Sequence, residues 1–314
     1  MKNSKYNAKI KSLLLNVVDF DILDRYNEPH RFYHNWNHIE YMLNIASNRN
    51  ILTDELILAI VFHDIIYDPK SNDNEEKSAE LFYSFFKDSD EVNAEKIRLS
   101  ILDTKHHNNF SSELAKTLCE IDLYNLYDDF DVFYDISMSI FKEYQFVDFE
   151  TYKVERKKVL ERYNVNPDWI KAVDKFIPKI GILAGSFNKF HKGHMNILAK
   201  AEKIFDKVII ARGVNPEKNN ELRPLPECLS YRQIEYYDGL LTDFIESLGY
   251  EVTLIRGLRN STDLQYEMVQ LQYMKDFKPD INVVNITCDK EFEHISSSAI
   301  RMLDKYGKSS NYLI

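Results

Sequence analysis

The sequence predicts a multi-domain chain in which an all-α domain precedes an α/β domain with a doubly wound, Rossmann-like parallel sheet. Up to residue 163, apolar residues recur every three or four positions, which is typical of amphipathic helices. From residue 179 onward, short apolar runs alternate with helical segments, which is typical of parallel strands with crossover helices. The chain has 314 residues, 44% of them hydrophobic, enough for two cores. We therefore expect domains over 1–163 and 179–314, joined by a linker over 164–178.

The expected helices of the first domain are separated by short stretches rich in Asn, Asp, Ser and Pro. They lie at residues 38–47, 54–67, 74–86, 94–107, 112–126 and 132–146. In the second domain a helix beginning near Met195 follows the first strand. The expected strands lie at 179–187, 207–214, 251–258 and 281–287. The sequence thus predicts no strand before residue 164 and four strands after residue 178.

Composition and charge exclude several classes of function. The net charge of −10, from 40 basic and 50 acidic residues, argues against a general nucleic-acid-binding role. Cys119, Cys228 and Cys288 form no CxxC or zinc-like spacing, and an odd count suits a reducing compartment. No segment resembles a signal peptide or reaches the length of a membrane span. We therefore expect a cytoplasmic protein with neither nucleic acid nor membrane as partner.

A histidine motif follows the first expected strand. The segment GSFNKFHKGH, residues 185–194, lies between a strand end and a helix start. The carboxyl end of a parallel strand opens on the crevice where ligands bind, and the next helix presents unpaired N–H groups to a phosphate chain. Gly185 lets the backbone approach closely, and Gly193 leaves space between the histidines. His191 and His194 can then both face a triphosphate and stabilise charge on its α-phosphoryl group.

This segment resembles the signature of the HxGH nucleotidyltransferases, and residues 179–314 resemble pantetheine-phosphate adenylyltransferase. The resemblance includes KIFDKVIIARGVNPEK, LLTDFIESLGYEVTLIRGLRNSTDLQYE and ISSSAIR, in this order. It implies transfer of AMP from ATP, with Mg²⁺, to 4′-phosphopantetheine, which gives dephospho-coenzyme A and pyrophosphate. Cytidylyltransferases of the same superfamily usually carry an RTxGISTT-like segment near the end, and this sequence has none.

The resemblance also implies roles for single residues. His194, with His191 beside it, would stabilise the transition state, and Lys218 would bridge the acceptor phosphate and the α-phosphate. ATP would contact Ser186, Phe187, His194, Gly257, Leu258, Arg259, Glu267, Ile295, Ser296, Ser297, Ser298 and Arg301. The acceptor would contact Ser186, Lys218, Leu241 and Arg256. Basic side chains are well suited to hold two polyanions together, and hydroxyls at a helix start complete an anion site.

The sequence departs from the resembled family at two places. Asn188 and Lys189 stand where the family usually has Asp and Pro, which alters the loop. Between Lys218 and Leu240 the chain is shorter than the family's helix and strand, which help to form the acceptor pocket. An alternative acceptor is therefore nicotinamide mononucleotide, because its adenylyltransferases share GxFxxxHxGH and an ISS-type motif. The RGLRNSTDLQYE block favours phosphopantetheine.

Histidines and acids also recur in the helical half. His34 and His38 are four residues apart and share a helix face, and the pair His63–Asp64 follows an apolar helical stretch. Imidazole and carboxylate together suit Mn, Fe, Zn or Mg, and a mixed set is typical of hydrolytic metal sites. The whole pattern consists of His34, His38, His63, Asp64, His106, His107 and Asp122.

Residues 25–163 resemble the HD-domain metal-dependent phosphohydrolases through RFYHNWNH, FHDIIYD, DNEEKSAE, TKHH and IDL, in this order. The resemblance implies a divalent metal such as Mn²⁺, Fe²⁺, Zn²⁺ or Mg²⁺, bound by His38, His63, Asp64 and Asp122. A second metal or a substrate phosphate would contact His34, Glu75, His106 and His107. Glu120 stands where the resembled group usually has Asp. The reaction would be attack of an activated water on a phosphoester or phosphoanhydride of a small molecule.

Together these patterns predict a bifunctional enzyme whose partners are ATP and a small phosphate-bearing acceptor. The resembled transferases form oligomers, so a homo-oligomer is compatible with this prediction. Three alternatives stand beside it. In the first, the helical half is a nucleotide-sensing, non-catalytic regulator. In the second, it keeps the histidines only as buried polar pairs. In the third, the whole chain is a scaffold that binds nucleotide. The co-occurrence of His194, Lys218 and Arg259 argues against the scaffold.

Overall fold

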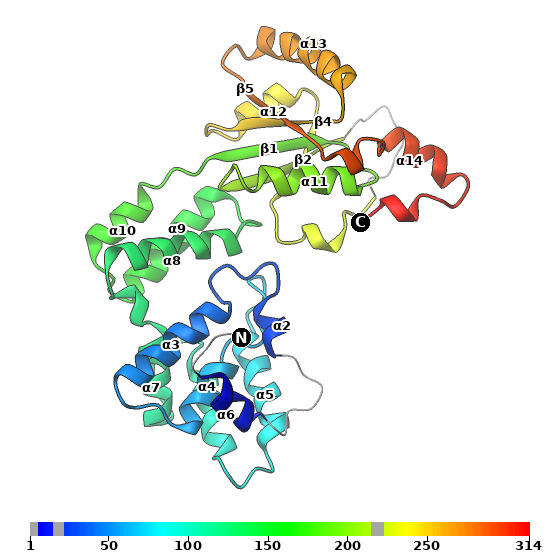
Figure 1. Cartoon of the computed structure of the whole chain (residues 1–314). Helices are drawn as coiled ribbons and strands as arrows, with labels where there is room; N and C mark the ends of the chain where they lie inside the picture. The colour runs from blue at the N-terminus through cyan, green and yellow to red at the C-terminus, as the bar shows by residue number, and fades with distance from the viewer. Residues whose placement is uncertain (1–5, 15–21, 215–222) are drawn as a thin grey trace. The chain divides into compact units, whose positions relative to one another are not determined.

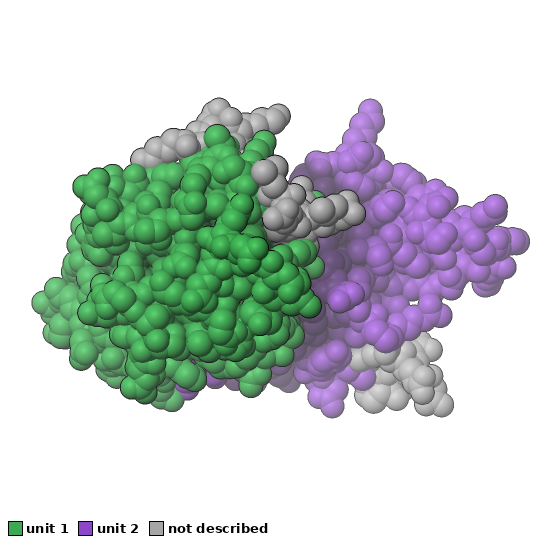
Figure 2. All heavy atoms as spheres, turned by 90° about the horizontal axis from the view of Figure 1, so that it is seen from below, with its two compact units in different colours: residues 1–143, 156–174 green, residues 144–155, 175–314 purple. Residues whose placement is uncertain are grey.

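The computed structural model describes residues 6–14, 22–214 and 223–314, which form two compact units (Figure 2). Unit 1 comprises Met1–Glu143 and Arg156–Asp174, and unit 2 comprises Tyr144–Glu155 and Lys175–Ile314. The chain therefore passes between the units more than once, and the division falls within helix α9 (Phe149–Arg162) as well as after residue 174.

Unit 1 is helical throughout its described part (Figure 1). Its elements are α1 (Asn7–Leu13), α2 (Ile22–Tyr26), α3 (Trp36–Asn48), α4 (Asp54–Phe62), α5 (Asn74–Phe86), α6 (Ala94–Asp103), α7 (Glu113–Asp122), the 3₁₀ turn η1 (Tyr124–Leu126), α8 (Phe130–Glu143), the second part of α9, and α10 (Pro167–Asp174). No helix among the described residues is both long and apolar enough to cross a membrane.

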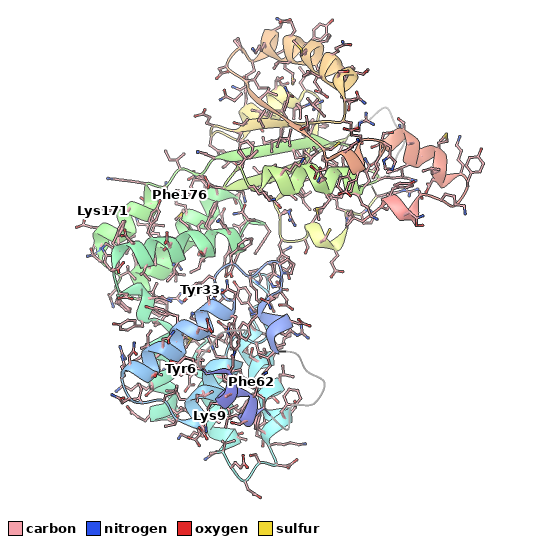
Figure 3. The ribbon with its side chains drawn as sticks, in the orientation of Figure 1. Tyr6, Lys9, Tyr33, Phe62, Lys171 and Phe176 are labelled. Atoms are coloured by element: carbon pink, nitrogen blue, oxygen red, sulfur yellow. The ribbon has the colours of Figure 1, made fainter. Side chains whose placement is uncertain are left out.

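Helix α4 forms the centre of unit 1. All its residues from Leu56 to Phe62 are buried, and α3, α5, α6 and α7 pack around it. Figure 3 labels Phe62 in this core, where its ring meets the Phe82 ring edge-on at a centroid distance of 5.3 Å. Because α4 is buried on all sides, the polar pair that follows it, His63–Asp64, is also held inside the helical unit.

Side-chain caps fix the starts of the helices that surround this core. The side chains of Asn35, Thr53, Asn93 and Ser112 each accept a hydrogen bond from a backbone N–H two or three residues further on, at 2.9–3.2 Å. A cap of this kind contributes about 1 kcal/mol to stability. Since Asn35 and Thr53 begin α3 and α4, they set the positions of the histidines carried by these two helices.

Unit 2 is built on a five-stranded parallel sheet with the strand order β3-β2-β1-β4-β5 (Figure 1). Ile182 of the central strand pairs with Ile209 on one side and Leu254 on the other. The chain moves outward from β1 to β3 and then crosses to β4, so its direction reverses between β1 and β4. Such a reversal is where open α/β sheets bind ligands. The strands are β1 (Ile180–Gly185), β2 (Lys207–Val214), β3 (Ile234–Asp238), β4 (Thr253–Leu258) and β5 (Asn282–Thr287).

Helices cover both faces of the sheet (Figure 1). Helix α11 (Lys192–Ala201) lies on one face, whereas α12 (Leu241–Ser247) and α13 (Ser261–Phe277) lie on the other. Gly257 allows α11 to pack closely, because a Cβ at this position would lie 2.9 Å from Cγ1 of Ile197. The remaining elements are α14 (Ser297–Asp304) and the 3₁₀ turns η2 (Glu227–Leu229), η3 (Lys290–Phe292) and η4 (Ser310–Tyr312).

The sheet confirms the predicted α/β class but has one strand more than the sequence predicted. The additional strand, β3, pairs only with β2 and reads IEYYD, with Tyr236 56% exposed. It lacks the apolar run that marks a buried parallel strand, which is why periodicity missed it. Before it, the described residues 223–233 contain only the turn η2. Helix α11 also begins three residues before Met195, because His191 caps it.

A buried lysine fastens residues 144–155 to the sheet of unit 2. Lys207, the first residue of β2, is 1% exposed, and its Nζ donates to the carbonyl oxygens of Gln145 and Val147 at 2.5 and 2.7 Å. Burial lowers the pKa of Lys207 from 10.5 to about 7, although Asp148 and Glu235 act in the opposite direction. The neutral amine still has hydrogens for both carbonyl groups, so the contact does not depend on charge.

We expect unit 2 to become more stable as the pH rises from about 7 towards 10.5. In this window the folded protein binds fewer protons at Lys207 than the unfolded chain does. The free energy of unfolding therefore rises with pH, by up to about 1.4 kcal/mol per pH unit. Lys207→Met should remove this slope, whereas Lys203→Met, at an exposed position after α11, should retain it. Denaturant unfolding at pH 7, 8 and 9 measures the slopes, and equal slopes in wild type and Lys207→Met contradict the lowered pKa.

Candidate functional sites

Two histidines cap the start of α11 and stack on each other. Nδ1 of His191 accepts a hydrogen bond from the backbone N–H of His194 at 3.2 Å, and Nδ1 of His194 accepts from the backbone N–H of His191 at 3.4 Å. The ring centroids are 3.5 Å apart. Gly193 leaves room for this stack, because a Cβ there would lie 3.2 Å from the His191 ring. Since both Nδ1 atoms are acceptors, each neutral ring carries its hydrogen on Nε2.

Both rings are neutral near physiological pH. Burial lowers the pKa of His191 to about 4, and the charge of Arg259 adds to this effect. Burial, followed by His191 and Arg259, lowers the pKa of His194 to about 3. Nε2 of His191 lies 3.5 Å from Oγ of Ser297, whereas Nε2 of His194 bonds to none of the described residues. His194 therefore presents a neutral and free N–H donor.

Two arginines at the end of β4 are paired with acids of α13. Arg256 donates two hydrogen bonds to Glu267, at 2.5 and 2.7 Å, and Arg259 donates two to Asp263, both at 2.8 Å. The planar guanidinium group binds phosphate with the same two-pronged geometry. Each arginine is thus oriented by a carboxylate, and a phosphate ligand would share or replace these contacts.

The start of α14 adds hydroxyl groups to the same region. Oγ of Ser296 caps the helix by accepting from the backbone N–H of Ala299 at 3.1 Å. Oγ of Ser298 accepts from Arg301 at 2.9 Å. Together with Ser297 beside His191, these residues offer hydroxyls and a helix N-terminus, a combination that suits an anion.

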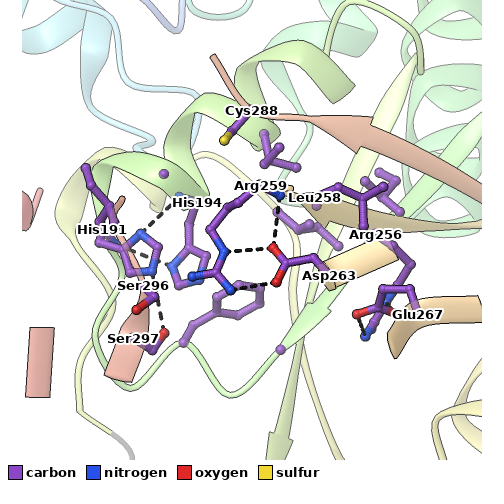
Figure 4. A pocket seen from close by; sticks show the side chains of 18 of the residues that line it. His191, His194, Arg256, Leu258, Arg259, Asp263, Glu267, Cys288, Ser296 and Ser297 are labelled. Carbon is purple, nitrogen blue, oxygen red and sulfur yellow. Dashed lines mark hydrogen bonds and ion pairs between the residues drawn. The ribbon is translucent and has the colours of Figure 1, made fainter. Parts of the chain in front are cut away.

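These groups line one pocket of about 620 Å³ between the carboxyl ends of β1 and β4 (Figure 4), a volume in the range of small-molecule sites. Of the ATP and acceptor residues predicted from the sequence, Arg301 and Leu241 do not line it. Lys218 lies outside the described residues. The predicted residues that line the pocket are Ser186, Phe187, His191, His194, Arg256, Gly257, Leu258, Arg259, Glu267, Ile295, Ser296, Ser297 and Ser298.

The pocket also contains residues that the sequence interpretation missed. Asp263 was detectable, because it lies four residues after Arg259 inside the RGLRNSTDLQYE segment, and the two form an ion pair. Tyr266, in the same RGLRNSTDLQYE segment, was given no role, and Cys288, which no motif marked, also lines the pocket. In the altered loop, Lys189 forms an ion pair with Asp304. Lys189, which stands where the resembled family usually has Pro, is thus held by a contact to α14.

In unit 1, the four predicted metal ligands converge. The Nε2 atoms of His38 and His63 are 3.3 Å apart. Oδ2 of Asp64 lies 3.0 Å from Nε2 of His63 and 3.9 Å from Nε2 of His38. Oδ1 of Asp122 lies 3.1 Å from Nε2 of His38 and 3.7 Å from Nε2 of His63. The histidine side chains are 1% exposed and the aspartates 16%, so the carboxylates form the open side of this HD cluster.

Three of the donor distances in the HD cluster match the spacing around one divalent ion. Nitrogen and oxygen ligands at about 2.1 Å from an ion lie about 3.0–3.4 Å from each other. The distances of 3.0, 3.1 and 3.3 Å fall in this range, whereas those of 3.7 and 3.9 Å are longer. Nδ1 of His63 donates to the carbonyl of Ile60 at 2.8 Å, which leaves Nε2 free for a metal. Burial lowers the pKa of His63, but Asp64 and then Asp122 outweigh it and raise the pKa to about 9. The HD cluster therefore attracts positive charge, either a proton or a metal ion.

Surrounding groups orient the HD cluster. The buried Arg31 donates to the backbone carbonyl of Asp64 at 2.7 Å and so holds the turn after α4. Nε2 of His107 lies 2.8 Å from Oδ2 of Asp122, and the Tyr163 hydroxyl lies 3.3 Å from Nδ1 of His107. His107 thus binds the oxygen of Asp122 that does not face His38, and this contact aims the other oxygen into the cluster.

The residues predicted for a second metal or a phosphate lie outside this donor set. His38, His63 and Asp64 form a group of metal-type donors within 4.8 Å of one another, and Asp122 lies 3.1 and 3.7 Å from the two histidines. His106 is exposed, and His107 orients Asp122. Glu75 lies in the first turn of α5, where burial raises its pKa. His34 binds Glu143, a residue that no sequence motif marked.

Unit 2 has the features of a nucleotidyltransferase-like domain: a parallel sheet, stacked histidines at a helix start and a pocket lined by groups that suit phosphate. Residues 182–303 match the family described as Cytidylyltransferase-like. A phosphopantetheine adenylyltransferase of Streptococcus pneumoniae (strain CGSP14) is 34% identical over 140 residues, which cover 41% of this chain and 86% of that protein. One of Rhodopirellula baltica is 29% identical over 143 residues, 43% of this chain and 79% of that protein. Through its C-terminal part, the chain belongs to the phosphopantetheine adenylyltransferase family. The resemblance predicted for that half is confirmed.

Proposed function

We propose that unit 2 transfers AMP from ATP to 4′-phosphopantetheine and releases pyrophosphate. The observation that carries this proposal is the Nε2–H of His194, which has no partner among the described residues and lines a pocket shared with Arg256 and Arg259. The relatives support the choice of substrates, since their names specify adenylyl transfer to phosphopantetheine. The acceptor side rests on Ser186, Arg256 and these relatives, because Leu241 lies outside the pocket lining.

In the proposed reaction an oxygen of the acceptor phosphate attacks the α-phosphorus of ATP. The new P–O bond forms as the bond from the α-phosphorus to the bridging oxygen breaks, and pyrophosphate leaves with that electron pair. Nε2–H of His194 would donate to an α-phosphoryl oxygen as negative charge develops there. No proton needs to be transferred, so a neutral imidazole with a low pKa suits this role. Mg²⁺ carried by ATP would neutralise part of the phosphate charge.

For unit 1 we propose hydrolysis of a phosphoester or phosphoanhydride of a small molecule. The convergence of His38, His63, Asp64 and Asp122 supports it, because these donors come from α3, the turn after α4 and α7, and three of the distances between them match ligands to one ion. A divalent ion held there would lower the pKa of a bound water towards about 7. Asp64 and Asp122, the more exposed members, lie on the side from which water and substrate would approach.

The acceptor is tested by incubating the full chain with ATP, Mg²⁺ and either 4′-phosphopantetheine or nicotinamide mononucleotide. We expect mass spectrometry to find dephospho-coenzyme A and an equal amount of pyrophosphate with the first acceptor. The formation of NAD from the second acceptor, and no product from the first, would show that the alternative acceptor is the substrate. Absence of any AMP transfer would remove the transferase proposal.

We expect His194→Ala to lower kcat about a hundredfold or more, with little change in the KM for ATP. The reason is that the Nε2–H donor stabilises charge that exists only in the transition state. Lys192→Ala is a matched control, since Lys192 is exposed in the first turn of the same helix and does not line the pocket. Steady-state kinetics measure both, and an unchanged kcat in His194→Ala excludes this residue from the mechanism.

We expect the purified chain to carry about one divalent metal ion in unit 1 and to hydrolyse a phosphate compound. Asp64→Ala should remove both properties and leave adenylyl transfer largely intact, because the two sites use different residues. Asp131→Ala, at an exposed position of α8, is the control, because it removes one acidic side chain away from the HD cluster. Elemental analysis and a phosphatase screen provide the readouts. Wild type that is metal-free and inactive after addition of Mn²⁺ or Mg²⁺ contradicts the hydrolase, and a metal-bound but inactive wild type favours the sensor.

A further inference from the structure

A buried carboxylate joins the end of α8 to the loop before α3. Glu143 is 1% exposed. Its Oε1 accepts hydrogen bonds from the backbone N–H groups of Phe32, Tyr33 and His34 at 2.8, 2.7 and 2.8 Å. Its Oε2 lies 2.6 Å from Nδ1 of His34 and accepts from the Tyr67 hydroxyl at 2.7 Å.

These contacts fix the charge of Glu143 and the tautomer of His34. The three backbone groups and the phenol all donate, so both carboxylate oxygens act as acceptors, which is the state of an ionised carboxylate. Nδ1 of His34 must then be the donor. An ionised Glu143 also compensates a second proton on this ring, on Nε2, and Nε2 has no partner among the described residues.

His34 lies beside the HD cluster. Its ring stacks on Tyr67 at a centroid distance of 4.2 Å and meets the Tyr33 ring edge-on at 4.7 Å. The His38 ring is 6.2 Å away. The His34 side chain is 22% exposed, against 1% for His38, and it feels the charges of Asp64 and Asp122. His34 is thus close enough to act on a molecule bound at the cluster.

We propose that Glu143 is a positioning residue, which holds His34 through Nδ1 so that Nε2 contacts a phosphate oxygen of the substrate bound at the HD cluster. This proposal rests on the proposed hydrolase and specifies how it holds phosphate. His34 lies outside the group of donors within 4.8 Å of one another, so it does not complete the metal site. A phosphate bound to the ion would, by contrast, also reach a neighbouring side chain. An imidazole with a carboxylate partner is a suitable contact for it.

The probe is inorganic phosphate, titrated calorimetrically into the full chain loaded with Mn²⁺. Binding that persists in Asp64→Ala belongs to the transferase pocket and is subtracted. We expect Glu143→Gln to weaken phosphate binding at least tenfold with unchanged metal content. The amide keeps an acceptor for the three backbone N–H groups but donates to Nδ1 of His34, so Nε2–H meets the phosphate without the positive charge that an ionised Glu143 compensates. Tyr67→Phe, which removes another donor to the same oxygen, should change the affinity less than threefold.

A double-mutant cycle separates positioning from general structural support. His34→Ala should weaken phosphate binding at least as much as Glu143→Gln, and the double variant should be no weaker than His34→Ala alone, since both changes act on one contact. Additive losses, or an unchanged affinity in Glu143→Gln, would overturn the proposal. If Glu143→Gln is unstable, His34→Ala alone decides, because it leaves the other four bonds of Glu143 in place.

The outcomes also distinguish this proposal from the hydrolase. Mn²⁺-loaded wild type that binds phosphate through Glu143 and His34 but hydrolyses nothing supports the positioning role and contradicts the hydrolase. Hydrolysis with full activity in Glu143→Gln, at wild-type phosphate affinity, supports the hydrolase and overturns the positioning role. Wild type that binds no Mn²⁺, or no phosphate when loaded, overturns the positioning role.

Discussion

The hydrogen-bonded pairing of β1 with β4 brings the pocket of unit 2 together. These strands are separated by about 70 residues, yet Ile182 and Leu254 are register partners at the centre of the sheet. Because the crossover helices of the two strands lie on opposite faces, a crevice remains at their carboxyl ends. The stacked histidines enter it from α11, and the arginine–carboxylate pairs enter it from β4 and α13. Neither set could form a site alone.

Unit 1 obeys a different constraint, the cost of burying charge in a helical core. An unpaired buried carboxylate would be strongly destabilising, so each one has nearby donors. Asp122 receives His107 on one oxygen and faces His38 with the other, and Glu143 receives five donors. Polar groups of this kind specify one packing arrangement, because alternative helix positions would leave them unsatisfied. The arrangement that satisfies them also gathers the HD cluster.

Much of this could be predicted from the sequence because the signals are local. The strand, loop and helix around His194 are neighbours in the chain, and helical periodicity identified α3 to α8 without any knowledge of their packing. The edge strand β3 was missed since it is only partly buried and has no apolar run. The role of Glu143 was not predictable, because its partner His34 is 109 residues away and only tertiary packing joins them. Nothing in the local sequence distinguishes it from a solvated acid.

The interleaving of the two units determines how the chain can be divided. Unit 2 includes Tyr144–Glu155, whereas Arg156–Asp174 belongs to unit 1. A fragment that begins at residue 179 would lack the carbonyl groups that bind Lys207, and one that ends at residue 143 would lack Leu160 of the helical core. No single cut releases both units intact. Gene truncation or limited proteolysis would therefore damage one unit whenever it isolates the other.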